Sequence, residues 1–284
     1  MQIVRDVPTL RELVAQSRMA ARPVAFVPTM GALHAGHVSL VRLARAAGGL
    51  TVVSIFVNPL QFAPGEDLAR YPRREEEDAA LLEREGADVL YLPTEASLYP
   101  PDFSTVIEVA GVSEGGEGAM RPGHFRGVAT VVAKLFLRVL PDVAVFGRKD
   151  LQQVAVVRRL IRDLDLPIRL RVGEIVRESD GLALSSRNAY LSPEDRRRAP
   201  DLARTLFAAR ARAVHGARDA RHLEEEAVRQ LEAARFQIDY VEAVDPLTMR
   251  RVTEVRKGIC LAAAVRLGQT RLLDNVYLLD PKRT

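Results

Sequence analysis

The chain has one cysteine, no tryptophan and no long uncharged apolar run among its 284 residues. Cys260 cannot form a disulfide within the chain, and its apolar neighbours predict a small buried side chain. Aromatic residues make up 5% of the sequence, which argues against a platform that stacks nucleic-acid bases. No apolar stretch approaches the roughly 20 residues that span a bilayer, and the first residues carry no signal-peptide pattern. We therefore expect a cytoplasmic protein that does not bind a membrane.

The sequence also lacks a large excess of either positive or negative charge. The 41 Lys and Arg residues stand against 37 Asp and Glu residues, giving a net charge of +4, and the two signs are interleaved. The Arg-rich stretch 196–212 is typical of a solvated helix face. Neither a basic patch nor a nucleic-acid-reading module is evident, so we expect no nucleic-acid partner. Steeply salt-dependent RNA binding would favour the opposite conclusion.

Strand-like and helix-like segments alternate through the first half of the chain. This alternation predicts an α/β fold with a parallel sheet covered by helices on both faces. Ligands of such folds lie beyond the carboxyl ends of the strands, and His34, Asn58, Gln61 and Lys149 all follow predicted strands. The expected strands are 24–27, 51–57, 89–92, 105–109 and 143–146, and the expected helices are 9–20 (opened by a Thr9–Glu12 capping box), 38–47, 75–85, 127–139 and 151–164.

The pattern changes near Val176. Two helical stretches, 193–215 and 220–234, precede three strand-like runs at 238–244, 258–265 and 270–276. Ser192, followed by a proline and two acids, is a strong helix start. We therefore predict two domains, 1–176 and a smaller α+β cap at 177–284.

The most informative segment is Pro28–His37, with the sequence PTMGALHAGH. It follows an apolar run and precedes an amphipathic stretch, so it reads as strand, tight turn and helix start. A helix start offers unpaired N–H groups and a positive dipole end, which suit a phosphate, and Gly36 lets the backbone approach a ligand. His34 and His37 can donate to phosphate oxygens or stabilise developing negative charge. The alternatives are a structural helix cap or a metal pair, although a zinc site lacks a third ligand at a recognisable spacing.

A second polar segment, Leu184–Asn188, places two hydroxyls, a guanidinium and an amide between predicted elements. Such donors suit a triphosphate, because arginine makes planar, two-pronged contacts with phosphate. An ordinary polar surface loop is the alternative. Together with the histidine segment, it resembles the mobile phosphate-binding loop of HxGH-type nucleotidyl transferases.

Nearly the whole chain resembles the pantothenate synthetase (pantoate–β-alanine ligase) family. Matching segments occur in the family's order and at its intervals: Pro28–His37, Val57–Phe62, Gly123–Val128, Phe146–Gln153, Ser185–Asn188 and, last, Gly268–Asn275. The family pattern usually has Glu at Ala35, Glu at Arg148 and Met at Leu184. The Arg148 difference adds positive charge beside the expected nucleotide.

The resemblance implies a Rossmann-like sheet domain and an ATP-dependent ligase that joins pantoate to β-alanine through a pantoyl adenylate. It further implies Mg²⁺ with the triphosphate and a homodimer. Glu77 or Asp78 aligns with the family's acidic segment, but residues 74–78 also look like an acidic helix start, and we assign no metal ligand. The implied catalytic residues are His37, His34 and Lys149. The implied nucleotide-binding residues are Met30, Gly31, Ala32, Leu33, His34, Ala35, Gly36, His37, Gly147, Arg148, Lys149, Asp150, Val176, Leu184, Ser185, Ser186 and Arg187, and the implied pantoate-binding residues are Gln61, Gln153 and Asn58.

One further enzyme class remains open: an HxGH nucleotidyl transferase that acts on a small phosphorylated acceptor. Gln61 and Gln153 argue against it, because neutral amides suit a small hydroxy acid better than a phosphate ester.

Overall fold

The computed structural model describes residues 1–281, which form two compact units. The first unit contains residues 1–109, 121–148 and 156–174, and the second contains 110–120, 149–155 and the chain from 175 onward. The sequence-based domains 1–176 and 177–284 remain a prediction.

The first unit is built on a six-stranded sheet in the order β1-β4-β3-β2-β5-β6, and every neighbouring pair is parallel. The predicted parallel sheet is therefore confirmed. The strands are β1 (Gln2–Val4), β2 (Val24–Thr29), β3 (Leu50–Ile55), β4 (Val89–Tyr91), β5 (Val143–Gly147) and β6 (Arg169–Gly173).

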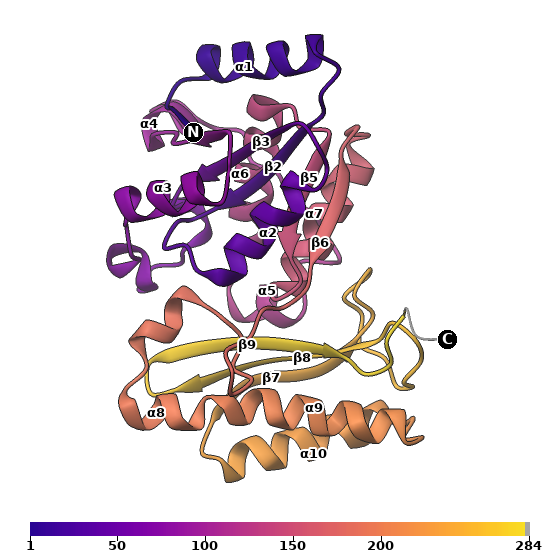
Figure 1. The fold of residues 1–284 in the computed structure, drawn as a ribbon. Coiled ribbons are helices and arrows are strands. Elements are labelled where there is room, and N and C mark those ends of the chain that lie inside the picture. The colour runs from indigo at the N-terminus through magenta and orange to yellow at the C-terminus, as the bar shows by residue number, and fades with distance from the viewer. Residues whose placement is uncertain (282–284) are drawn as a thin grey trace. The chain divides into compact units, whose positions relative to one another are not determined.

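Helices cover both faces of this sheet (Figure 1). On one face, Val41 of α2 and Leu82 of α3 pack against Val27 and Val53 of the sheet. On the other face, Phe136 of α6 meets Phe26 of β2 edge-on, with ring centroids 6.4 Å apart. This division follows from the alternation of side chains along β2. The helices are α1 (Val7–Met19), α2 (Ala35–Arg45), α3 (Glu75–Arg84), α4 (Glu95–Leu98) and α6 (His124–Val139), the 3₁₀ turns are η1 (Pro59–Gln61) and η2 (Asp67–Arg70), and α7 (Leu151–Asp163) begins in the second unit's segment.

Two sequence-based expectations for this unit are wrong in detail. Helix α1 starts at Val7 and is capped by Asp6, whose carboxylate accepts from the Thr9 N–H, so the Thr9 capping box does not open it. Residues 105–109 are outside both sheets, because the Ile107 N–H donates to the Thr130 hydroxyl and not to a strand.

Strand order reverses beside β2, which has β3 on one side and β5 on the other. Such a switch point leaves a crevice at the carboxyl ends of the strands, where ligands of open α/β sheets bind. The segments that follow β2, β3 and β5 therefore meet at one edge of the sheet.

The second unit contains an antiparallel sheet of β7 (Gln237–Val244), β8 (Cys260–Leu267) and β9 (Thr270–Tyr277). Helices α9 (Pro200–Val214) and α10 (Ala220–Ala233) lie along one face of it (Figure 1). Their buried leucines form one core with the strands. The α+β expectation for this part of the chain is confirmed. Its shorter elements are α5 (Gly116–Met120), η3 (Ser186–Tyr190) and α8 (Pro193–Arg198).

The predicted helix 193–215 is two helices. Ser192 caps α8 as expected and accepts from the Asp195 N–H at 3.0 Å. A second helix then starts at Pro200, whose fixed φ and missing N–H suit a first helical turn better than a helix interior.

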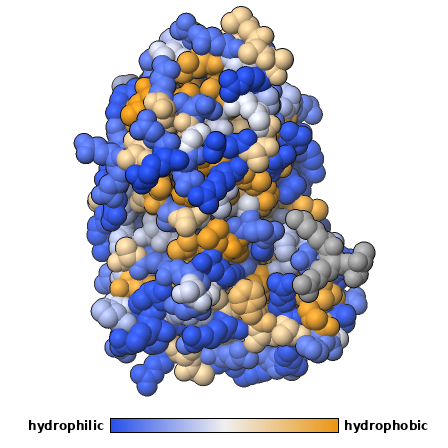
Figure 2. All heavy atoms as spheres, viewed as in Figure 1, coloured by the Kyte–Doolittle hydropathy of each residue, from blue (hydrophilic) through white to orange (hydrophobic). Residues whose placement is uncertain are grey.

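Hydrophilic residues cover most of the face drawn in Figure 2. Cys260 is fully buried in β8, as predicted. Among the described residues, no helix has the length and apolar character needed to cross a membrane.

Candidate active site

The turn between β2 and α2 has an unusual backbone held by side chains. Gly31 and Ala32 both have positive φ, 85° and 51°. A Cβ at Gly31 would lie 3.0 Å from a methyl group of Ile55, so both conformation and space favour glycine there. The Thr29 hydroxyl accepts from the Gly31 N–H and donates to the Ser54 carbonyl.

Asp78, in the first turn of α3, reaches this turn from a different element. Its two carboxylate oxygens accept from the Ala32 and Leu33 N–H groups, each at 2.8 Å. The residue is 3% exposed. Burial raises the pKa of the Asp78 carboxyl above its ordinary 3.8, while the two N–H donors act in the opposite direction. Asp78 thus makes the Ala32–Leu33 backbone part of one hydrogen-bonded assembly with α3.

The two imidazoles cap helix α2. The Nδ1 atom of His34 accepts from the Gly36 N–H at 3.1 Å, and the Nδ1 atom of His37 accepts from the His34 N–H at 3.3 Å. The ring centroids are 4.1 Å apart. Since each Nδ1 accepts, each neutral ring carries its proton on Nε2. The helix-cap alternative is therefore observed, and it places two Nε2 donors beside the positive end of a helix dipole, a suitable place for an anion.

The Asn58 and Gln61 side chains are linked at the end of β3. Asn58, 1% exposed, donates to the Gln61 Oε1 atom and to the Gly127 carbonyl, both at 3.1 Å. Its Oδ1 atom accepts from the Tyr99 hydroxyl at 2.8 Å. The Gln61 amide nitrogen donates to the Met30 sulfur at 2.9 Å. Gln61 therefore presents N–H donors on the side of the β2–α2 turn.

The backbone around Gln61 is held just as firmly. Arg121 and His124 both contact the Gln61 carbonyl oxygen, at 3.2 and 2.8 Å. Arg121 also forms a two-pronged pair with Glu66. Burial alone would raise the pKa of Glu66, but the hydrogen bonds and charge of Arg121 outweigh it and lower the pKa below 4.5. His124, for which sequence analysis offered no firm role, thus holds the end of η1.

Strand β5 ends at Gly147, and Arg148 follows it at the same edge. The Arg148 guanidinium donates to the Glu174 carboxylate from Nε at 3.0 Å and from Nη2 at 2.8 Å. Glu174 therefore offsets the extra positive charge by which Arg148 departs from the usual family pattern.

In the second unit, Lys149 and Asp150 precede helix α7. The Lys149 ammonium lies 3.5 Å from an Asp150 carboxylate oxygen, and the Lys149 side chain is 21% exposed. The Asn275 amide donates to the Lys149 carbonyl at 3.0 Å, which ties this backbone to β9. Gln153 lies partly buried in the first turn of α7.

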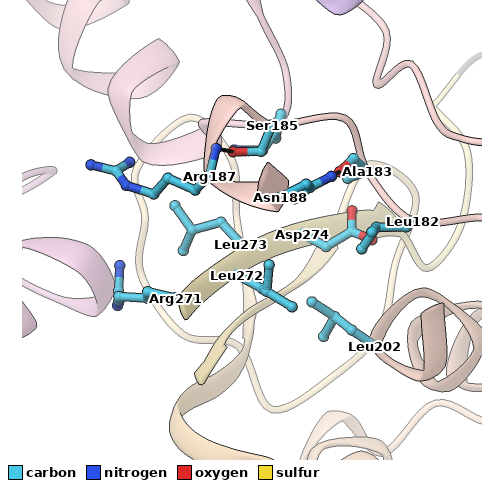
Figure 3. A pocket seen from close by; sticks show the side chains of 11 residues that line it. Leu182, Ala183, Ser185, Arg187, Asn188, Leu202, Arg271, Leu272, Leu273 and Asp274 are labelled. Atoms are coloured by element: carbon cyan, nitrogen blue, oxygen red, sulfur yellow. Dashed lines mark hydrogen bonds between the residues drawn. The ribbon is translucent and has the colours of Figure 1, made fainter. Parts of the chain in front are cut away.

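A pocket in the second unit collects several of the predicted residues (Figure 3). Its polar lining includes Lys149, Ser185, Arg187, Arg271 and Asp274. Figure 3 shows Arg187 in η3 and Ser185 just before it, beside β9. The Ser185 hydroxyl accepts from the Arg187 N–H at 3.2 Å. Arg271 is already paired with Glu117 and Asp239, so the cationic side chains that favour an anionic ligand here are Lys149 and Arg187.

Three other residues predicted to bind the nucleotide, Val176, Leu184 and Ser186, lie in or before η3 in the chain. The Leu184 N–H donates to the Val176 carbonyl at 3.0 Å, so the two residues are paired across a turn. Ser186 begins η3. What sequence analysis described as a loop is thus a short 3₁₀ helix with Ser185 as its cap.

Asp274 of the pocket lining forms a buried ion pair with Arg177. The two guanidinium nitrogens donate to the two carboxylate oxygens at 2.5 and 2.8 Å. The side chains are 16% and 1% exposed. Asp274 also accepts from the Asn275 N–H, so the pair supports the residue that holds Lys149.

Within residues 1–281, no three His, Cys, Asp or Glu side chains converge in a way that would hold a metal ion. Both Asp78 oxygens accept from backbone N–H groups, and no such cluster surrounds it in the described residues, so the side chains present do not build a Mg²⁺ cage.

Within the first unit, the structure brings together Met30–His37, Asn58, Gln61 and Gly147–Arg148 at the carboxyl edge of the sheet. Within the second, it brings Lys149, Ser185 and Arg187 to one pocket. Sequence reasoning missed the residues that support these groups: Tyr99, Arg177, Asp274 and Asn275, and the anchoring contacts of Asp78. Their partners are 41 to 126 positions away in the chain, and no local pattern signals them.

The parallel sheet with its switch point and its polar carboxyl edge define a Rossmann-like α/β protein. Comparison with known proteins identifies the family. The pantoate–β-alanine ligase family model matches residues 2–277. The pantothenate synthetase of Rhizorhabdus wittichii is 54% identical over 276 residues, covering 97% of this chain and 98% of the relative.

Solved structures agree with that match. The pantothenate synthetase of Thermus thermophilus superposes with a TM-score of 0.93 at 46% identity, covering 98% of this chain and 100% of the other. The pantoate–β-alanine ligase of Francisella tularensis, crystallised with beta-gamma ATP and β-alanine, gives 0.81 at 30% identity, with 98% of each chain covered. This chain belongs to the pantoate–β-alanine ligase family and is an enzyme of the ligase class.

Proposed function

We propose that the chain catalyses the ATP-dependent condensation of pantoate with β-alanine to pantothenate, by way of pantoyl adenylate. The observation that carries this proposal is the match of residues 2–277 to a single ligase family. The ATP and β-alanine in the Francisella tularensis relative supply the same two substrates.

The reaction needs two steps, because a carboxylate is a poor acyl donor. In the first, a pantoate carboxylate oxygen attacks the α-phosphorus of ATP, the bond to the bridging oxygen breaks and pyrophosphate leaves. In the second, the β-alanine amine attacks the acyl carbon, AMP leaves and the nitrogen loses a proton. The first step requires stabilisation of charge on the phosphates more than it requires a covalent protein nucleophile.

His34, His37 and Lys149 supply that stabilisation. The segment Met30–His37 wraps the nucleotide, and the two Nε2–H groups donate to phosphate oxygens as negative charge builds. The dipole of α2 favours the same anion. Lys149 adds a full positive charge at the α- or β-phosphate.

The other nucleotide contacts come from two short segments. Ser185, Ser186 and Arg187 bind the departing pyrophosphate through hydroxyl and guanidinium donors. Gly147, Arg148, Asp150, Val176 and Leu184 border the nucleotide. Glu174 pairs with Arg148, so the two side chains together carry no net charge, but the change from the family's usual Glu to Arg still makes this position more positive.

Gln61 and Gln153 bind pantoate. Asn58 holds the Gln61 oxygen, so Gln61 offers N–H donors, which match the hydroxyl and carboxylate oxygens of pantoate. Asn58 supports the pantoate pocket from behind Gln61.

The proposal includes Mg²⁺ as a partner of the triphosphate and assigns it no protein ligand, since this ion usually keeps several waters and takes few protein ligands. In our proposal, residues 1–176 hold the nucleotide and pantoate, and 177–284 form a cap. A homodimer and a cytoplasmic location complete the proposal, and light scattering of the purified protein tests the dimer.

Pyrophosphate–ATP exchange with pantoate alone, followed by AMP release on addition of β-alanine, tests the function. We expect exchange that depends on pantoate and AMP release that depends on β-alanine. Exchange that depends instead on a phosphorylated acceptor would favour the alternative nucleotidyl transferase, and no exchange with either would refute both.

The same assay tests the role of His37. His37→Ala should slow exchange by about two orders of magnitude or more, as loss of a transition-state donor typically does. The matched control is His215→Ala, which removes an exposed imidazole at the end of α9. Loss of the helix-cap contact alone would cost only about 1 kcal/mol of stability, which the melting temperature reports. Unchanged exchange in His37→Ala would contradict the assignment.

A further inference from the structure

The strongest unassigned feature is the contact between helix α3 and the β2–α2 turn. Asp78 is the only residue of the acidic run Glu75–Asp78 that is buried, while the three glutamates are exposed. Acidic side chains at a helix start usually lie on the surface, where they interact favourably with the positive end of the helix dipole. Burial of one carboxylate at 3% exposure needs a separate reason, because desolvating a charge is costly unless it is hydrogen-bonded.

The hydrogen bonds provide that reason. The Asp78 Oδ2 atom accepts from Ala32 N–H and Oδ1 accepts from Leu33 N–H, both at 2.8 Å. The two oxygens therefore hold two consecutive backbone N–H groups, and they do so where Gly31 and Ala32 have positive φ. A left-handed alanine costs conformational energy, so this turn persists only if surrounding contacts determine it.

We propose that Asp78 is a positioning residue for the nucleotide site: it fixes the Met30–Leu33 backbone, and through it the start of α2, in the conformation that receives the phosphates. Asp78 acts through the turn and not as a ligand of a metal ion. The inference rests on the proposed function in that Met30–His37 is taken as the nucleotide segment. The anchoring contact itself is a property of the fold and is tested separately.

Asp78→Asn is the informative variant, because it keeps the size of the side chain. An asparagine has one acceptor oxygen, and its NH₂ group would face the second backbone N–H. One of the two anchoring hydrogen bonds must therefore be lost. Glu76→Gln is the matched control, since it makes the same change of charge at an exposed position two residues earlier on the same helix.

The first measurement is amide hydrogen exchange of Ala32 and Leu33, together with the melting temperature. At least one of these amides should exchange about tenfold faster or more in Asp78→Asn, as loss of a hydrogen bond to a charged group implies, and neither should change in Glu76→Gln. Amide protection equal to that of the wild type would overturn the anchoring contact, whatever reaction the protein catalyses.

The second measurement is steady-state kinetics of pantoate-dependent exchange. Asp78→Asn should lower kcat/KM for ATP by about tenfold or more. It should leave the KM for pantoate and the Mg²⁺ concentration for half-maximal rate within about twofold. An unchanged kcat/KM for ATP would overturn the positioning role. A shifted Mg²⁺ requirement with unchanged amide protection would make Asp78 a metal ligand and overturn it as well.

The two measurements also separate this inference from the proposed function. If the wild type shows no pantoate-dependent exchange but Ala32 and Leu33 lose protection in Asp78→Asn, the anchoring contact stands and the proposed function fails. Calorimetry of ATP binding to the wild type and to Asp78→Asn then decides the positioning role. A loss of affinity of about tenfold or more in the variant supports it, and equal affinities overturn it.

Discussion

Replacing Arg177 would leave the Asp274 carboxyl without its partner in a site where 1% of that side chain is exposed and where burial already raises its pKa. Arg177→Met retains most of the side-chain volume, including contact with the Phe207 ring, whose centroid lies 4.9 Å from the guanidinium carbon. The change therefore removes mainly the charge and its hydrogen bonds. Removing one partner of a buried pair typically costs about 3–5 kcal/mol.

For chains of this size, about 2–4 °C of melting temperature is lost per kcal/mol, so we expect a decrease of about 6–20 °C. The double variant Arg177→Met, Asp274→Leu removes both charges. It should recover much of that loss, because well-packed apolar side chains can replace a buried ion pair at little cost. The Asn275 N–H then lacks its Asp274 acceptor, which leaves a deficit of about 1–3 kcal/mol.

Differential scanning calorimetry of the wild type, both single variants and the double variant completes the cycle. The reasoning is refuted if Arg177→Met lowers the melting temperature by less than about 2 °C, or if the double variant is less stable than Arg177→Met alone. Either result would mean that the Asp274 carboxylate is not held by Arg177 in the way the short contacts indicate.

Two further outcomes are expected in the first unit. Gly127→Ala would place a Cβ 2.2 Å from the Leu60 carbonyl oxygen and 2.6 Å from the Gln61 nitrogen, so backbone must separate. The free energy of unfolding should fall by about 1–3 kcal/mol or more, and the KM for pantoate should rise. A melting temperature within about 1 °C of wild type, which corresponds to a loss of only about 0.5 kcal/mol, would contradict this. Glu66 has a folded-state pKa below 4.5, so its pair with Arg121 contributes stability above pH 4.5 that is lost as pH falls through the lowered value. Glu66→Gln should therefore be less stable than wild type at neutral pH, and the difference should shrink at about pH 3; urea titrations at both pH values check it, and a gap that widens in acid would contradict the sign.

The alternation of strands and helices was predictable because the buried strands of the parallel sheet are short apolar runs. The exceptions have physical causes. Strand β1 has only three residues, two of them exposed, so it carries no periodic signal. Residues 105–109 have strand-like composition, yet Ile107 donates to a side chain. Propensity and pattern describe local preference, and tertiary partners decide these cases.

The candidate site likewise contains residues that local sequence motifs predict and residues that they do not. The spacing of His34 and His37 predicts a helix start with two imidazoles, and the structure has such a helix start at α2. The carboxylate that holds their turn could not be assigned, because Asp78 lies 46 positions from Ala32 and resembles an ordinary acid at a helix start. The same holds for Asn275, 126 positions from the Lys149 carbonyl that it contacts. Chemistry-bearing groups are therefore readable from local motifs, whereas the residues that orient them depend on the fold.

The single thiol of the chain, on Cys260, is fully buried within β8. A thiol shielded in an apolar strand reacts slowly with maleimides, since the reactive thiolate is disfavoured there. One cysteine introduced on the surface would thus take up a fluorescent dye selectively in the native protein, without prior removal of the natural residue. Labelled variants could then report substrate-induced motion directly by fluorescence.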